Sequence, residues 1–115
     1  MAYDEELSAR FRDCLEGIVG LSEKKMMGGV CFMLDGNMIG GADRQKNGQG
    51  RFMFRVGKDN HDQALARPGA IAMEQGGRRM SGFIFVHEED CDTATLKSWI
   101  SLAMSFVTTL PPKKK

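Results

Sequence analysis

The stretch from Lys24 to Ala42, KKMMGGVCFMLDGNMIGGA, constrains this chain most, because it carries a strong β-hairpin signal. Asp35-Gly36 stands between two apolar runs. A type I′ turn needs a positive φ at both central residues, and Asp-Gly adopts that conformation readily. The turn also fixes the register of the two strands. Two cross-strand pairs are predicted: Met33 with Met38, and Phe32 with Ile39.

Apolar residues at helical spacing predict a long helix near each end of the chain, over residues 4–19 and 93–109. Asp92 is expected to cap the second of these helices. A shorter helix is expected over 59–67, because Pro68 and the glycine after it stop helical geometry.

Alternating side chains predict a strand over 51–56, and shorter apolar runs predict strands over 70–73 and 83–86. With the hairpin, the order becomes α-β(3)-α-β(2)-α. We therefore expect an α+β fold in which an antiparallel sheet packs against helices. The length fits one domain, over 1–110, followed by a basic tail at 111–115.

The charge balance argues against a domain built to bind nucleic acid. The net charge is +1, and three of the 16 basic residues are the lysines that end the sequence. The rest of the chain has a slight excess of acidic side chains, and no stretch places basic residues along one helix. We expect no direct specific binding of DNA or RNA.

The cysteines Cys14, Cys31 and Cys91 lie in or beside apolar segments, are odd in number and show no C-x-x-C spacing. This pattern is typical of reduced thiols rather than of a disulfide framework. No apolar run approaches the length of a membrane span, and the acidic start of the sequence is unlike a signal peptide. We expect a cytoplasmic protein without a membrane segment.

The residue patterns predict no catalytic centre, metal site or cofactor. A nucleophilic cysteine needs a neighbouring base, and neither His61 nor His87 has a spacing to a cysteine that indicates such a pair. His87 and Cys91 flank three acidic residues, but no second cluster completes a metal shell. The paired glycines fit no phosphate-binding loop. We expect a protein that is not an enzyme.

Basic residues on the predicted strands form one candidate binding site. Lys25, Arg55 and Arg78 could together hold a small anion or an acidic partner, since arginine offers forked donors. The alternative is a set of solvated surface charges paired with nearby acids.

Nine methionines in 115 residues are an unusually large number, and strand alternation gathers several of them. Phe52 and Phe54 point to one face of their strand, and Met53 points to the other. The aromatic face suits a helix-covered core. The opposite face would carry an apolar set of four residues: Cys31, Met33, Met38 and Met53. Because uncovered apolar patches usually mark interfaces, we expect a second copy to bury this set in a two-fold dimer.

Several ordered motifs resemble the TfoX N-terminal domain family. They are AYDEEL near the start, EKKMMGGVCFMLDGNM at 23–38, RVG at 55–57, ALARPGA at 64–70, GRRMSGFIFV at 77–86 and LPPKKK at the end. The similarity covers nearly the whole chain. It implies a secretion-chaperone-like α-β(3)-α-β(2)-α fold and a stand-alone member without the family's C-terminal domain.

The two-domain members of this family regulate natural competence and are thought to act with the cyclic-AMP receptor protein at promoters. The resemblance therefore favours a small, non-catalytic protein–protein interaction module with a regulatory role and an unidentified protein partner. The alternative is a small-molecule or anion-binding protein, or a minor enzyme, that uses the basic residues of the sheet.

Overall fold

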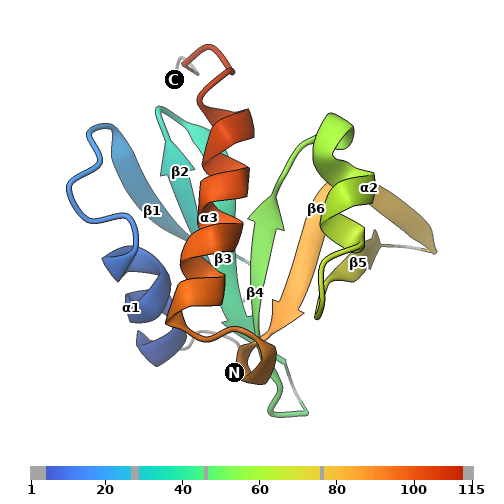
Figure 1. Ribbon diagram of the computed structural model, residues 1–115. Coiled ribbons are helices and arrows are strands. Elements are labelled where there is room, and N and C mark those ends of the chain that lie inside the picture. Colours follow the sequence, from blue (N-terminus) through green and yellow to red (C-terminus); the bar gives the residue numbers. More distant parts are fainter. Residues whose placement is uncertain (1–4, 27–28, 46, 76, 113–115) are drawn as a thin grey trace.

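The computed structural model describes residues 5–26, 29–45, 47–75 and 77–112. This part of the chain forms three helices and six strands (Figure 1). Their bounds are α1 Glu5–Asp13, β1 Leu21–Met26, β2 Gly29–Leu34, β3 Asn37–Arg44, β4 Gly50–Arg55, α2 His61–Leu65, β5 Ile71–Gln75, β6 Arg78–His87 and α3 Thr93–Val107. The 3-10 turns η1 Lys58–Asn60 and η2 Glu88–Asp90 precede α2 and follow β6.

The strands form one antiparallel sheet in the order β1-β2-β3-β4-β6-β5. The α+β class and the packing of an antiparallel sheet against helices are thus confirmed. The structure adds one strand to the expected order, because Leu21–Met26 pairs with β2 along its whole length and forms an edge of the sheet. The observed order is therefore α-β(4)-α-β(2)-α.

The hairpin between β2 and β3 has the predicted turn, since Asp35 and Gly36 both have positive φ, 50° and 85°. Met33 lies opposite Met38 as expected, but Phe32 lies opposite Gly40 and not Ile39. A β-bulge causes this shift, because Ile39 is an extra residue in β3. The predicted Phe32–Ile39 pair is therefore wrong.

The bulge has a packing reason. Ile39 is fully buried in the core, and Gly40 lies directly against the ring of Phe11 in α1. A β-carbon at Gly40 would stand 3.2 Å from Phe11 Cζ and 2.1 Å from the carbonyl oxygen of Met53. The extra residue brings a bulky side chain and a glycine to the same side of the sheet, and α1 packs against both.

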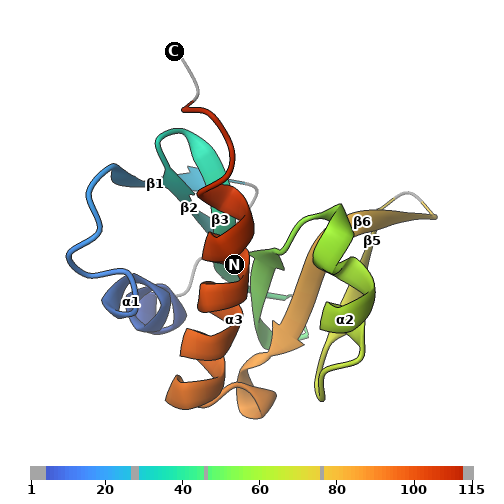
Figure 2. The ribbon, with the colours of Figure 1, turned by 45° about the horizontal axis from the view of Figure 1, so that its top comes forward.

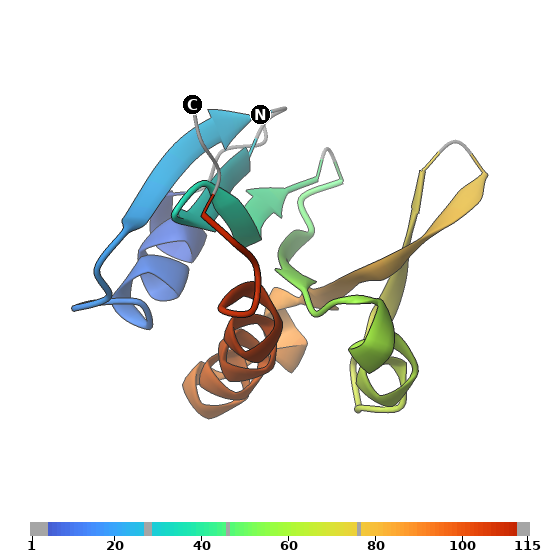
Figure 3. The ribbon, with the colours of Figure 1, turned by 90° about the horizontal axis from the view of Figure 1, so that it is seen from above.

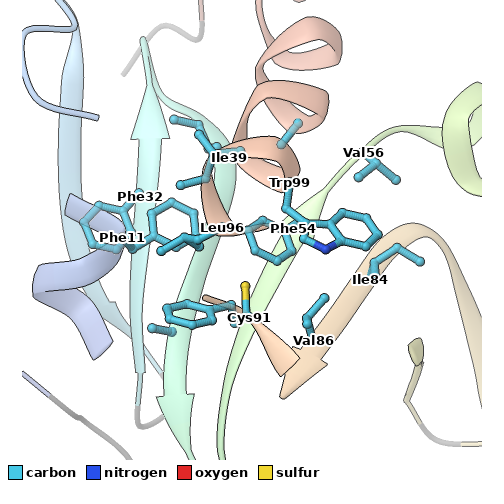
Figure 4. Packing of buried hydrophobic residues seen from close by; sticks show 14 of the residues in the cluster. Phe11, Phe32, Ile39, Phe54, Val56, Ile84, Val86, Cys91, Leu96 and Trp99 are labelled. Atoms are coloured by element: carbon cyan, nitrogen blue, oxygen red, sulfur yellow. The ribbon is translucent and has the colours of Figure 1, made fainter. Parts of the chain in front are cut away.

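All three helices lie on one side of the sheet, as the turned views show (Figures 2 and 3). The core between helices and sheet is rich in aromatic rings (Figure 4). Phe11 of α1 stacks on Phe32 at a centroid distance of 4.7 Å, and Phe54 stacks on Trp99 of α3 at 5.5 Å. Phe11 and Phe54 are themselves 5.8 Å apart, so one row of rings joins both long helices to the sheet.

The two long helices differ in how well their observed ends match the predicted ones. Asp92 caps α3 as predicted, and its carboxylate accepts the backbone N–H of Thr95 at 2.8 Å. α1 ends at Asp13, earlier than expected, and the chain continues through turns with i→i+3 hydrogen bonds as far as Ile18. Leu15 remains fully buried in these turns. No helix in the described ranges is long and apolar enough to cross a membrane.

The middle helix is tied to β6 through a buried histidine. The backbone N–H of Gly82 donates to Nδ1 of His61 at 2.9 Å. Gly82 also accepts from the backbone N–H groups of Val56 and Gly57, at 2.8 and 3.2 Å. These hydrogen bonds hold α2 on the same side of the sheet as α1 and α3.

Gly57 offers a test of this corner. Its backbone, at φ 88° and ψ 155°, is in a region that only glycine adopts readily, and a β-carbon there would lie 2.4 Å from the ring of Phe106. Gly17 has a similar φ of 87° with nothing within 4 Å. We expect Gly57→Ala to lower the free energy of unfolding by about 3 kcal/mol or more, and Gly17→Ala by about 1 kcal/mol.

Urea unfolding followed by tryptophan fluorescence measures both variants. Equal losses for the two would contradict the packing of Phe106 against Gly57.

Candidate functional site

The face of the sheet away from the helices, called the open face below, carries a continuous row of side chains. Register and alternation place one residue of each strand in this row: Lys24, Cys31, Gly41, Met53, Phe85 and Ile71. No element of the described chain packs over it, because the middle helix lies with the others on the far side (Figure 3).

The open face is hollowed into a pocket of about 480 Å³. Five adjacent strands contribute to its wall. The sheet is curved, as the view from above shows (Figure 3). The lining residues are Gly29, Val30, Cys31, Met38, Gly41, Ala42, Asp43, Arg51, Met53, Met73, Glu74 and Phe85. Most of them are apolar, which is typical of ligand and partner sites.

Gly41 helps to explain why the surface is hollow. It stands between Cys31 and Met53 in the row and has no side chain to fill the space. A β-carbon at Gly41 would lie 2.2 Å from the carbonyl oxygen of Val30, so the local backbone has no room for a larger residue. The floor of the pocket therefore remains bare between two sulfur-bearing side chains.

Arg51 is the most constrained polar group of the pocket. Its Nε and Nη2 donate to the two carboxylate oxygens of Asp43, at 2.8 and 3.2 Å. Its guanidinium carbon lies 3.8 Å from the centre of the Phe85 ring, within the range of a cation–π contact. The side chain of Arg51 is 24% exposed, and that of Asp43 is 27% exposed. Two neighbours thus hold the guanidinium in one orientation.

Arg51 was not among the residues predicted for a site, although alternation places it on the same face as Met53. The signal that could have found it is the pairing of β3 with β4, which sets Asp43 opposite Arg51. The bulge at Ile39 changes which residues of β3 point to the open face, and the sequence pattern did not reveal it.

The predicted methionine set does gather on the open face. Cys31, Met38 and Met53 line the pocket, and Met33 lies across from Met38 at its margin. All four side chains are half-buried. The structure adds Met73 of β5 to this set.

The structure places two of the three residues of the predicted basic site, Lys25 and Arg55, apart from each other. Lys25 pairs with Val30, whose side chain is in the helix-covered core, so alternation points Lys25 to the helix side. Arg55 is on β4, which is three strands away from β1, the strand of Lys25. Its guanidinium carbon lies 5.4 Å from the centre of the Phe106 ring. The side chain of Arg78 lies outside the described part of the chain. Lys25 and Arg55 therefore do not converge on one anion.

The thiol of Cys31 is a weak nucleophile in this setting. Burial raises its pKa above the ordinary value, and the nearby carboxylate of Asp43 raises it further. His61 lies on the helix side of the sheet, bonded to Gly82, and so cannot act as a base for Cys31. Among the described residues, no three His, Cys, Asp or Glu side chains group as a metal site would require.

The architecture defines an α+β protein whose sheet is covered by helices on one face and hollowed on the other. The family model of the TfoX N-terminal domain matches residues 13–107, and the chain belongs to this family. No curated protein and no solved structure matches the chain.

The pKa shifts predict how the cysteines react. Burial raises the pKa of Cys14 and Cys31, and raises that of Cys91 to about 11, so few thiolates exist near pH 8. We expect iodoacetamide to alkylate the folded protein far more slowly than the protein in guanidinium chloride, with Cys91 the slowest.

Asp43→Asn isolates the electrostatic part of this effect. Removing the carboxylate lowers the pKa of Cys31 and speeds its alkylation. Cys14 serves as the internal control, because the carboxylate that acts on it is Asp13 and not Asp43. Peptide mass spectrometry gives both rates. An unchanged ratio of the two rates would show that Asp43 does not act on Cys31.

Proposed function

We propose that this protein is a small, non-catalytic interaction module of the cytoplasm that binds a protein partner through the open face. The observation that carries the proposal is the placement of all three helices on one face of the sheet, which leaves a hollowed, methionine-rich face bare (Figures 2 and 3). Methionine side chains adapt their shape to a partner, and a large bare apolar surface usually marks an interface.

A second copy of the chain is the partner we propose, because the rims of the open face are complementary in charge. Lys24 is exposed on β1 and Glu74 is exposed on β5, at opposite edges of the sheet. A two-fold axis along the strands places β1 of one copy over β5 of the other. The Lys24 rim of each copy then faces the Glu74 rim of the other, and the two pockets face each other.

Family membership supports a regulatory role related to competence or transcription for this module. In this proposal the domain contributes an assembly surface and no chemistry. The three free thiols, two of them half-buried and one buried, are consistent with a reducing compartment.

Charged substitutions on the open face test the dimer. We expect Met33→Glu combined with Met53→Glu to give a folded monomer, because carboxylates in an enclosed apolar space lose their solvation. Light scattering at high micromolar concentration measures the mass, and circular dichroism checks the fold. Ser101→Glu with Ser105→Glu, at exposed positions of α3, is the matched control and should remain dimeric.

A charge exchange tests the orientation. Lys24→Glu should weaken the dimer, and adding Glu74→Lys should restore it. A wild type that is monomeric at these concentrations would refute the dimer, and failure of the exchange to restore it would refute the two-fold arrangement alone.

A further inference from the structure

Arg51 has hydrogen-bonding capacity inside an apolar pocket that no described group uses. We propose that the pocket of the open face binds a small amphipathic carboxylate, with the carboxylate on the outer edge of the Arg51 guanidinium and the apolar body against the methionines. The site belongs to a single subunit and does not depend on the proposed dimer.

The orientation of the Arg51 guanidinium leaves one of its edges for a ligand. Arginine has two edges that can each bind a carboxylate through two parallel N–H groups. Asp43 occupies the edge formed by Nε and Nη2. The other edge, formed by Nη1 and the second N–H of Nη2, has no acceptor among the described residues. A second carboxylate can therefore bind bidentately without displacing Asp43.

The guanidinium of Arg51 is preorganised for binding. The ring of Phe85 stacks on the guanidinium, and Asp43 holds it from the side, so little side-chain entropy remains to be lost when a ligand binds. Arg55 is on the same strand, but its guanidinium lies over the Phe106 ring of α3 and does not line the pocket. Arg51 is thus the described arginine that is aimed at the hollow.

The wall of the pocket suits the apolar body of such a ligand. Met38, Met53, Met73 and Phe85 line the pocket with flexible thioethers and one ring. A volume of about 480 Å³ is in the range of small-molecule sites, which usually combine apolar walls with a few polar groups. An acyl chain or a substituted ring of modest size fits this description.

The charges of the pocket select the head group. Arg51 can bind one more carboxylate, while Glu74 stands further along β5, toward the other end of the lining. A second negative group on the ligand would meet that carboxylate, and a polyanion would also be repelled by Asp43. The geometry therefore favours a ligand with one negative head and an uncharged body.

A series of ligands with one chain length tests the proposal on the wild-type protein. Octanoate, octanol and octylamine are titrated into protein labelled with ¹³C at the methionine methyl groups. We expect the methyl signals of Met38, Met53 and Met73 to shift with octanoate, and the signal of Met104 in α3 to stay in place. The octanoate affinity should exceed that of octanol and of octylamine at least tenfold.

Two matched variants locate the head group. Arg51→Gln should reduce octanoate binding at least tenfold and leave octanol binding unchanged, whereas Arg55→Gln should bind octanoate like the wild type. Equal binding of octanoate and octanol by the wild type, no binding of octanoate at millimolar concentration, or equal effects of the two variants would each overturn the proposal.

Two further measurements distinguish a small-acid site from a site for protein C-termini and from the dimer interface. An acetylated apolar tripeptide with a free carboxylate that binds more tightly than octanoate would assign the site to protein C-termini and overturn the small-acid proposal. Light scattering on the same samples reports the oligomeric state, so loss of the dimer and loss of ligand binding are read separately.

Discussion

The row of stacked rings from Phe11 through Phe54 to Trp99 is the contact on which the rest of the structure depends. It fastens a helix from each end of the chain to the same face of the sheet. Aromatic side chains bury large areas and prefer defined ring geometries, so this row sets both the position and the orientation of α1 and α3. With α2 tied to β6 on the same side, the described part of the chain has no helix left for the other face.

The hairpin shows how far local sequence patterns reach. The Asp35-Gly36 turn and the Met33–Met38 pair follow from local backbone preferences, and the sequence predicted both. The bulge at Ile39 does not follow from local preferences, because it makes room for the ring of Phe11, a residue far away in the sequence. β1 was missed for a similar reason: its charged residues suit a sheet edge, which alternation of apolar side chains does not detect.

The open face was predictable as a group of methionines, but its polar part was not. Alternation alone places Met53 and both arginines of β4 on one face, and gives no reason to prefer either arginine. The two arginines are distinguished only by the register with β3 and by the position of Phe85 on β6. These contacts orient Arg51 toward the pocket, whereas the guanidinium of Arg55 lies over Phe106. Residues that bind through a preorganised geometry are hard to find from spacing, because their partners come from other strands.

The charged edge of β1 has a consequence for growth of the sheet. Glu23, Lys24 and Lys25 are consecutive and exposed on this edge, and Glu23 is bonded to Arg12 at 2.5 Å. Adding another strand here would bring charges of a second chain against them and would disturb that ion pair, which discourages edge-to-edge stacking. The molecule is thereby steered away from open-ended filaments. Contacts between copies are instead directed to the faces of the sheet, where a two-fold rotation gives a closed assembly of fixed size.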